Sequence, residues 1–383
     1  MRYSLYNDFS SLPPGYRRLF DEWRSRSYCY SLDWFQNFVA TVKDPENQIV
    51  IYGVEAENRA ATPLAAIPMQ YSNLSGGPLG LRTLRPLANY YASLFGPVLD
   101  LETQEVEALV GDLVRAMMSN KRRWDAIDLS PLDTGSPVFP VLQNALREAG
   151  MVSQTYFCFA NWYLEVGGRS YAEYLKSLPS FLSKKIPYKT RRLEKHFNAR
   201  IQIITSNDGL DEALRGYETV YRASWKIPEP YPNFLPGLAR TALKNGWLRL
   251  GVVYLNDVPA AAQLWLVNDG VASIFKLSYD ERFVKDSVGT ILTAKLMEHV
   301  LDIDKVHTVD FLSGDDDYKK HWMSHRRERW GIYAMNRRTI PGCLSIFRHV
   351  GGRAAKRLWE RVRGASTTTP NSAQTDNVDR ESP

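Results

Sequence analysis

The sequence predicts a mixed α/β fold made of two domains in tandem, and two observations support this. Helical and strand-like segments alternate along most of the 383 residues, a length sufficient for two hydrophobic cores. In the second half, three strand-like segments follow one another across the short polar turns Asn256-Asp257 and Asn268-Asp269-Gly270. Because tight turns join antiparallel strands, this order favours a mixed sheet over a doubly wound parallel sheet.

The first domain is expected to span residues 1–166. Its helices follow from apolar residues at helical spacing, with Ser31 placed to cap the first and Gly150 to end the last. Its strands follow from short apolar or aromatic runs between polar turns. Gly167-Gly168 then forms a joint between domains. The predicted helices cover 32–42, 106–118 and 138–149, and the predicted strands cover 49–54, 64–71, 126–129 and 158–166.

The second domain is expected to span residues 167–340. It opens with a basic helical segment, 171–197, which Pro187 must kink or divide. A strand, two helices and the three strands joined by the turns come next, followed by a loop, a helix, a short strand, the start of another helix and a last strand. In order, these segments cover 200–205, 210–225, 235–244, 248–255, 260–267, 271–278, 280–289, 290–301, 308–312, 318–325 and 330–335.

The carboxy-terminal end is predicted to form a basic amphipathic helix at 341–364 and a disordered tail at 365–383. Six basic residues and one glutamate give the helix a net charge of +5, out of +6 for the whole chain. A basic amphipathic helix can lie on an anionic membrane or dock on its own protein, and the sequence favours neither. Peripheral membrane contact is therefore expected, if at all, through 343–363. The tail is polar and lacks large apolar residues.

Composition excludes several classes of protein. No apolar run approaches the ~18 residues of a membrane-spanning helix, and the amino terminus lacks the apolar core of a signal peptide. Cys29, Cys158 and Cys343 are far apart, so neither a disulfide framework nor a zinc site is indicated. His321 and His325 lie four residues apart but have no third ligand, so we expect no metal. A cytoplasmic protein fits best, with peripheral attachment to the inner membrane surface as the alternative.

Three segments of the second half resemble the GNAT acyltransferases, in particular the CelD-type group of polysaccharide biosynthesis, which is related to the Fem-type peptidoglycan transferases. The first is the basic helix with Ser224-Trp225-Lys226. The second is Val258-Pro259-Ala260-Ala261-Ala262 with Ser287-Val288-Gly289-Thr290. The third runs from Val309-Asp310 through Gly314 to Asp317-Tyr318-Lys319-Lys320-His321-Trp322. The first half resembles the family's degenerate amino-terminal GNAT-like domain through Ser31-Leu32-Asp33-Trp34-Phe35.

The resemblance implies acyl-coenzyme A as co-substrate. Its pyrophosphate is expected at a strand–turn–helix start, where free backbone N–H groups and the positive end of the helix dipole meet. Its acyl-pantetheine arm is expected between strands 271–278 and 308–312. The family has two spaced glycines in this turn and this sequence has only one, so an ordinary helix cap is the alternative. The cofactor-binding residues implied are Ser278, Ser287, Val288, Gly289 and Thr290.

Two residues are candidates for catalysis. Asp310 ends a buried strand beside the expected cleft and can act as general base, although an aspartate there often only binds backbone N–H groups. Tyr318 can protonate the departing thiolate. For substrate binding we expect phosphate contacts from cations and groove walls from tryptophans, with solvated or core roles as the alternatives. The residues are Arg191, Arg192, Trp225, Lys226, Lys319 and Trp322.

The expected function is transfer of an acyl group from acyl-coenzyme A to an amine or hydroxyl. By resemblance, the acceptor is a cell-envelope or exopolysaccharide precursor, such as a lipid- or nucleotide-linked sugar. Two alternatives remain open. One is a Fem-type transferase that uses aminoacyl-tRNA, the only reading in which the chain binds nucleic acid. The other is a catalytically silent GNAT-fold protein that binds a polysaccharide-synthesis complex.

Overall fold

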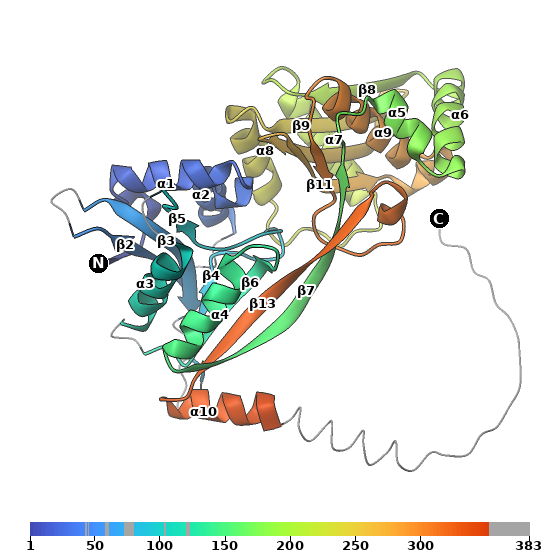
Figure 1. Cartoon of the computed structure of the whole chain (residues 1–383). Helices are drawn as coiled ribbons and strands as arrows, with labels where there is room; N and C mark the ends of the chain where they lie inside the picture. The colour runs from blue at the N-terminus through green and yellow to red at the C-terminus, as the bar shows by residue number, and fades with distance from the viewer. Residues whose placement is uncertain are drawn as a thin grey trace, which may run out of the picture.

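The computed structural model describes residues 1–42, 44, 46–57, 61–72, 80–102, 105–119 and 123–351. In these residues thirteen strands form one continuous mixed sheet, with helices packed on its faces (Figure 1). The predicted mixed α/β class is therefore confirmed. The strands follow the order β1-β2-β3-β4-β6-β13-β7-β12-β11-β10-β9-β8, and the short β5 (Val98–Leu99) pairs with β3 outside this path.

Two parts of the chain repeat one order of elements: a strand, two helices, three antiparallel strands, a helix, a strand, a helical segment and a final strand. The first repeat contains β1 (Arg2–Tyr6), α1 (Pro14–Arg24), α2 (Leu32–Thr41), β2 (Asn47–Glu55), β3 (Pro63–Ser72), β4 (Thr83–Pro86), α3 (Val106–Met118), β6 (Ala126–Asp133), α4 (Val138–Glu148) and β7 (Met151–Glu165). The second contains β8 (Ala199–Ile204), α7 (Leu210–Arg222), α8 (Phe234–Lys244), β9 (Leu248–Leu255), β10 (Val258–Asn268), β11 (Val271–Tyr279), α9 (Val288–Asp302), β12 (Thr308–Asp310), the 3₁₀ turn η4 (Lys319–His321) and β13 (His325–Asn336).

Each repeat also contains one parallel pairing at the same place in this order. The fourth strand pairs in parallel with the fifth, as β4 with β6 and as β11 with β12. The first repeat is the reduced one, because β4 has four residues where β11 has nine. The chain is thus a tandem of two related units, as the sequence predicts.

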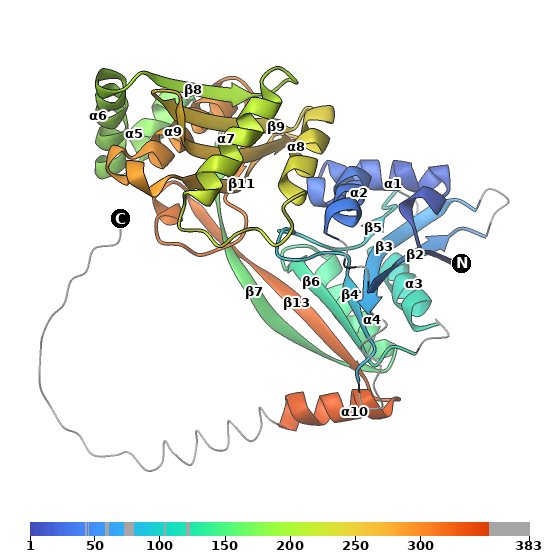
Figure 2. The same cartoon turned by 180° about the vertical axis from the view of Figure 1, so that it is seen from behind.

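The repeats exchange their final strands. β13, at the end of the second repeat, pairs with β6 of the first, and β7, at the end of the first, pairs with β12 of the second. The two exchanged strands also pair with each other, from His325 opposite Tyr163 to Asn336 opposite Met151. Figures 1 and 2 show β7 and β13 as long strands that run between the two halves. The predicted division after residue 166 therefore separates the repeats in sequence but not in the sheet.

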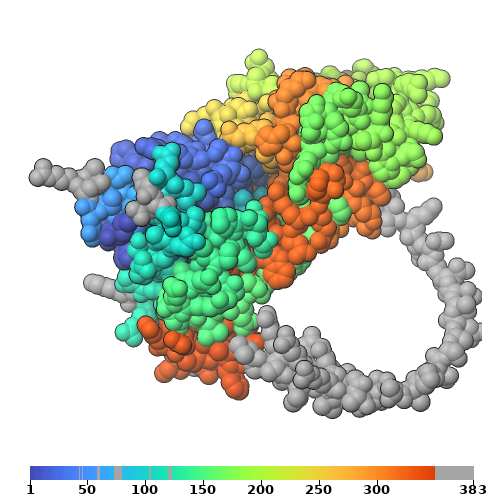
Figure 3. All heavy atoms as spheres, viewed as in Figure 1, coloured from blue at the N-terminus to red at the C-terminus, as the bar shows by residue number. Residues whose placement is uncertain are grey.

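Helices cover both faces of the second repeat, because alternate residues of its strands face opposite ways. Leu250 and Val252 of β9 lie in a core with α7 and α8, whereas Val253 and Leu255 lie in a second core with α9. The first of these cores continues into the first repeat, where the rings of Trp34 and Phe234 meet at 5.7 Å between centroids. Figure 3 shows the blue atoms of the first repeat against the yellow atoms of the second.

The predicted helix 171–197 is two helices, α5 (Tyr171–Ser177) and α6 (Ser180–His196), and both pack on α9. The chain divides at Pro179, which precedes the first turn of α6, and not at Pro187 inside it. A proline before a helix removes no hydrogen bond. Pro187 lies on the exposed face of α6, where water can bind the carbonyl left without a backbone donor.

The predicted helix 318–325 is wrong. The structure has only the η4 turn, and β13 begins at His325, five residues before the predicted last strand. The long β7 offers backbone partners along twelve residues, and this pairing between distant segments overrides the local helical pattern.

Of the predicted carboxy-terminal helix 341–364, the structure describes α10 (Ile340–Ile346) and the following turn, η5 (Phe347–Gly351). The remainder of that helix and the tail 365–383 lie outside the described residues. The turns η1 (Phe9–Ser11), η2 (Tyr28–Tyr30) and η3 (Glu281–Asp286) complete the elements. Within the described ranges, none of the helices has the length and apolar character needed to cross a membrane.

Candidate functional site

A cavity of about 1150 Å³ opens where β11 and β12 separate. The two strands are paired over only three residues, the last pair being Ser273 with Asp310. Beyond it β11 continues to Tyr279, while the other chain turns away and Leu312 takes a positive φ of 56°. The second half of β11 and residues 311–313 form opposite walls. The strands 271–278 and 308–312, between which an acyl arm is expected, therefore have an open space between them.

The first turn of α9 closes one end of the cavity, and Ser287, Val288, Gly289 and Thr290 all line it. This turn is fixed to the sheet by Gln263, whose buried amide donates to the Gly289 carbonyl at 3.1 Å and to Thr293 Oγ1 at 2.8 Å. A Cβ on Gly289 would lie only 3.0 Å from the Tyr279 ring, so glycine permits this close packing. The positive end of the α9 dipole is thus held at the cavity wall.

Ser278, on β11, also lines the cavity, and its hydroxyl is buried. Its side chain is 1% exposed and its Oγ has no hydrogen-bond partner in the structure. A buried polar atom without a partner costs free energy, so native proteins keep few of them. A ligand in the cavity, such as one with an amide or carbonyl group, would supply the missing partner.

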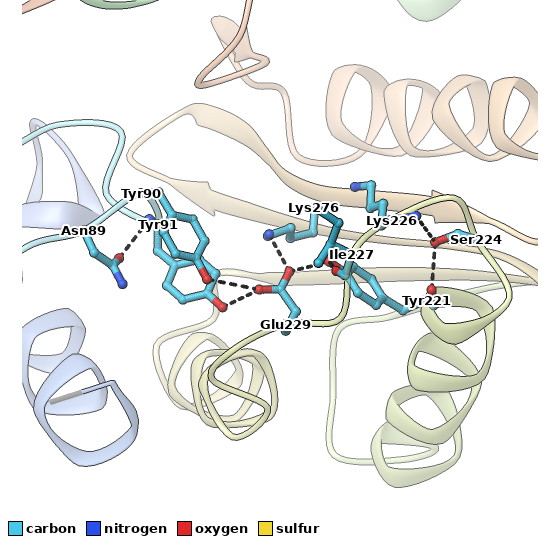
Figure 4. A network of polar contacts seen from close by, with 9 residues as sticks. All are labelled: Asn89, Tyr90, Tyr91, Tyr221, Ser224, Lys226, Ile227, Glu229 and Lys276. Atoms are coloured by element: carbon cyan, nitrogen blue, oxygen red, sulfur yellow. Dashed lines mark hydrogen bonds and ion pairs between the residues drawn. The ribbon is translucent and has the colours of Figure 1, made fainter. Parts of the chain in front are cut away.

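A carboxylate, Glu229, joins the first repeat to this cavity (Figure 4). It accepts hydrogen bonds from Tyr221 Oη at 2.8 Å, from Lys276 Nζ at 2.6 Å, and from Tyr90 and Tyr91, which lie in the first repeat. Burial alone would raise the pKa of Glu229, but the bonds from Lys276 and Tyr91 hold it below its usual value. Glu229 is therefore an anion that neutralises Lys276 and fixes the loop after α7.

Lys226, in the same loop, has an ammonium group without a carboxylate partner in the part of the chain that is described. It lines the cavity, and its Nζ lies 5.7 Å from the Trp225 ring and 5.9 Å from the Tyr221 ring. Burial, together with the nearby charge of Lys276, lowers the pKa of Lys226 to about 8. A lysine of this kind can bind an anion when charged and accept a proton when neutral.

Tyr318 and Lys319 line the wall opposite β11. The Tyr318 ring packs edge-on against Phe311, and desolvation with the nearby charge of Asp316 raises the pKa of its hydroxyl, which stays protonated at neutral pH. Lys319 is buried and already engaged, since its Nζ donates to the Ser313 carbonyl at 2.6 Å and pairs with Asp316 at 3.0 Å. Lys319 thus holds the loop that carries Tyr318.

Asp310 does not line the cavity, and its carboxylate is fully engaged. It accepts from Asn161 Nδ2 at 2.5 Å and from the Leu312 amide at 2.6 Å, and it forms an ion pair with Arg327. Arg327 in turn donates to Asn161 at 2.5 Å, which closes the network. The geometry therefore gives Asp310 a structural role, in which it binds a backbone N–H of the following loop, and not the role of a general base.

The remaining substrate-binding candidates fall into two places. Trp225 and Trp322 line the cavity, Trp225 being 49% exposed and Trp322 buried. Arg191 and Arg192 are exposed on α6 and lie outside the cavity lining. Ten of the thirteen candidate residues are thus brought together around one space, and Asp310, Arg191 and Arg192 are not.

Sequence reasoning missed Glu229, Lys276, Tyr91 and Gln263. Lys276 and Gln263 occupy inward positions of strands that otherwise read as apolar, and a polar residue there is a signal that could have been used. Glu229 lies in the proline-rich run Pro228-Glu229-Pro230, which reads as an ordinary exposed loop. Tyr91 lies far away in the sequence, and no local pattern links it to Glu229.

In the described residues, no three His, Cys, Asp or Glu side chains come together in a group that could hold a metal ion.

A family profile described as an acetyltransferase (GNAT) domain matches residues 180–320. The match begins at α6 and ends in η4, so it contains β11, α9 and β12 with most of the cavity walls. It confirms the GNAT resemblance of the second half and supports a transferase activity. The narrower CelD-type assignment stays a prediction. None of the curated proteins compared with the chain matches it.

Among solved structures, FemX is similar with a TM-score of 0.58 and 10% sequence identity, over 87% of this chain and 97% of FemX. A conserved protein of unknown function from Bacteroides thetaiotaomicron gives a TM-score of 0.52 and 8% identity, over 88% of this chain and all of its own. At such identities these similarities establish the fold and carry no information about activity.

Proposed function

We propose that the protein transfers an acyl group from acyl-coenzyme A to an amine or hydroxyl of a cell-envelope or exopolysaccharide precursor. The observation that carries the proposal is the cavity between β11 and β12, which has the unpartnered Ser278 hydroxyl on one wall and the start of α9 at one end. An acyl-pantetheine arm carries amide and carbonyl groups that suit Ser278, and its pyrophosphate suits the dipole of α9.

The reaction needs two proton transfers. The nucleophilic nitrogen or oxygen of the acceptor forms a bond to the thioester carbonyl carbon, and the carbon–sulfur bond breaks. The acceptor loses a proton and the thiolate gains one. Tyr318, whose hydroxyl stays protonated, would donate the second proton. Lys226, rather than the engaged Asp310, would accept the first, because its lowered pKa gives a neutral fraction near physiological pH.

Binding and turnover of the full-length protein test this proposal. A saturating acyl-coenzyme A should raise the melting temperature, because a ligand that binds only the folded state stabilises it. Release of free coenzyme A should follow when an acceptor is added. Tyr318→Phe should lower the turnover number about 10–100-fold while the melting-temperature shift persists.

Three outcomes separate the readings. A shift with an aminoacyl-tRNA and none with any acyl-coenzyme A would favour the Fem-type reaction. Binding of acyl-coenzyme A without turnover on any amine or hydroxyl acceptor would favour a silent binding protein. If neither acyl-coenzyme A nor aminoacyl-tRNA shifted the melting temperature, the proposal that the cavity binds an acyl donor would be contradicted.

A further inference from the structure

The exposed face of α6 carries five cations and two aromatic side chains in one stripe. Counted from Phe181, its members follow after 3, 4, 7, 10, 11 and 14 residues, spacings that return to one side of an α-helix. Phe181 and Tyr188 are 52% and 56% exposed and lie along the centre of the stripe. The cations flank them, and they are Lys184, Lys185, Arg191, Arg192 and Lys195.

The described part of the protein does not neutralise the charge of this stripe. Across the described residues none of the five cations forms an ion pair with a carboxylate, and Glu194 is the one acid in the sequence of α6. Two exposed cations on the other face of the second repeat, on α7 and α8, behave differently. Arg222 pairs with Glu218 at 2.5 Å and Arg240 pairs with Asp211 at 3.3 Å. The stripe is thus suited to an external anionic partner.

The stripe continues into an apolar rim around the cavity. Phe181 and Lys185 belong both to the stripe and to the cavity lining. Four further lining residues expose large apolar surface, and Ile227, next to this rim, is 86% exposed. Scattered exposed apolar side chains are ordinary, but a group around one opening is typical of an interaction site. The four are Tyr90 (56%), Trp225 (49%), Tyr318 (42%) and Val284 (39%).

We propose that the α6 stripe and this rim form a docking surface for an anionic lipid bilayer, from which the acceptor enters the cavity. A bilayer interface takes up aromatic and aliphatic side chains and at the same time attracts flanking cations to its headgroups. A nucleic acid would also use the cations and stack on aromatic rings, but the aliphatic Val284 and Ile227 offer it nothing. The surface therefore favours lipid, and a lipid-linked acceptor deepens the proposed function on which it rests.

Vesicle sedimentation with the full-length protein tests this surface. Binding to phosphatidylcholine vesicles containing about one quarter phosphatidylglycerol is compared with binding to pure phosphatidylcholine. One variant removes four of the five positive charges by Lys184→Gln, Arg191→Gln, Arg192→Gln and Lys195→Gln. A second removes the apolar centre by Phe181→Ser and Tyr188→Ser. The matched control, Arg215→Gln, Arg222→Gln, Arg240→Gln and Lys244→Gln, removes four exposed cations from α7 and α8.

The wild type should bind only the anionic vesicles. Each interfacial cation contributes about fivefold, so the charge variant should bind at least about 100-fold more weakly, and the apolar variant at least about tenfold. The control should bind within about twofold of wild type. Circular dichroism confirms that each variant is folded.

Two results would overturn the docking surface. Vesicle binding that is unchanged in both α6 variants would place the contact elsewhere, for example on the basic carboxy-terminal segment. Binding to total tRNA is measured in parallel. If the charge variant lost tRNA binding but bound vesicles as the wild type does, the stripe would be a nucleic-acid site. The vesicle experiment does not depend on turnover. If the protein bound vesicles but transferred no acyl group, the docking surface would be supported and only the proposed reaction would be contradicted.

Discussion

At the scale of single residues, the cavity is lined by polar groups that have no partner in the described part of the chain. Among the described residues, the Ser278 hydroxyl has no hydrogen-bond partner and the Lys226 ammonium has no carboxylate partner, whereas Lys276 and Lys319 in the same cavity each have a carboxylate. Polar groups that have no hydrogen-bond or ion-pair partner within the fold are available to bind a ligand.

Ser278→Ala tests whether the unpartnered hydroxyl serves a ligand. Removing it should leave the free energy of unfolding unchanged or raise it by up to about 1 kcal/mol, because a buried polar group without a partner is lost. Affinity for acyl-coenzyme A should fall about fivefold to tenfold. Chemical denaturation and calorimetric titration measure the two effects. A loss of stability above about 1 kcal/mol would show that the hydroxyl has a partner within the fold.

Lys226 predicts a pH dependence of the reaction. A lysine that accepts a proton must be neutral, so kcat/KM should rise with pH up to about 8, the lowered pKa of Lys226, and then level off. Lys226→Arg keeps the charge but cannot lose its proton, and should abolish both the rise and most of the activity. Lys244→Arg, on the exposed face of α8, is the control. An unchanged profile in Lys226→Arg would assign the proton to another group.

The sequence predicted the cavity residues of the second repeat better than the residues that complete the site. Ser278 to Thr290 and Tyr318 are close to recognisable segments, and the structure places them on one space. Asp310 is at the expected position, but Asn161 and Arg327, distant in sequence, engage its carboxylate. Glu229 and Tyr91 are 138 residues apart, so only the folded chain shows that they meet.

At the scale of elements, the site depends on how closely α9 approaches β11. Gly289→Ala would place a Cβ 3.0 Å from the Tyr279 ring, so either the ring or the first turn must move by a few tenths of an ångström. We expect a loss of about 1–2 kcal/mol of stability and about tenfold weaker binding of acyl-coenzyme A. Thermal unfolding and calorimetric titration measure these changes.

Gly111→Ala is the control for this substitution. Gly111 lies in the middle of α3, where a Cβ meets only the flexible Arg115 guanidinium at 3.4 Å, so alanine should be neutral or stabilising. If Gly289→Ala behaved like Gly111→Ala, the close packing of α9 would not be needed.

Most elements were predictable because their patterns are local. The hairpin turns at Asn256-Asp257 and Asp269-Gly270 adopt the positive φ values that their residues favour. The errors at 318–325 and at Pro187 have another origin. Residues 325–336 form a strand because they pair with β7, which is distant in the sequence. Pro187 does not end the helix because it lies on the exposed face of α6.

At the scale of the whole molecule, the exchange of β7 and β13 makes the two repeats dependent on each other. Residues 1–166 alone would lose β13 from between β6 and β7, and would expose the edges of both strands. We expect this fragment to be unfolded or aggregated by itself. Co-expressed with 167–383, it should co-purify and regain the circular dichroism of the intact chain. A monomeric, cooperatively unfolding 1–166 would contradict this dependence.

The same exchange explains how residues of both repeats line one cavity. Tyr90 and Tyr91 reach Glu229 and the wall of the cavity because the continuous sheet and the shared core fix the first repeat against α8. The sequence of either half alone does not predict this contact. β13, which pairs with β6 and β7 of the first repeat, comes from the end of the second repeat.

The most direct measurement is a crystal structure of the full-length protein with a non-hydrolysable thioether analogue of an acyl-coenzyme A. Density for the pantetheine arm should lie between β11 and residues 311–313, with one of its polar groups within hydrogen-bond distance of Ser278 and the pyrophosphate at the first turn of α9. Density for the analogue anywhere else, with this cavity still open, would contradict the account.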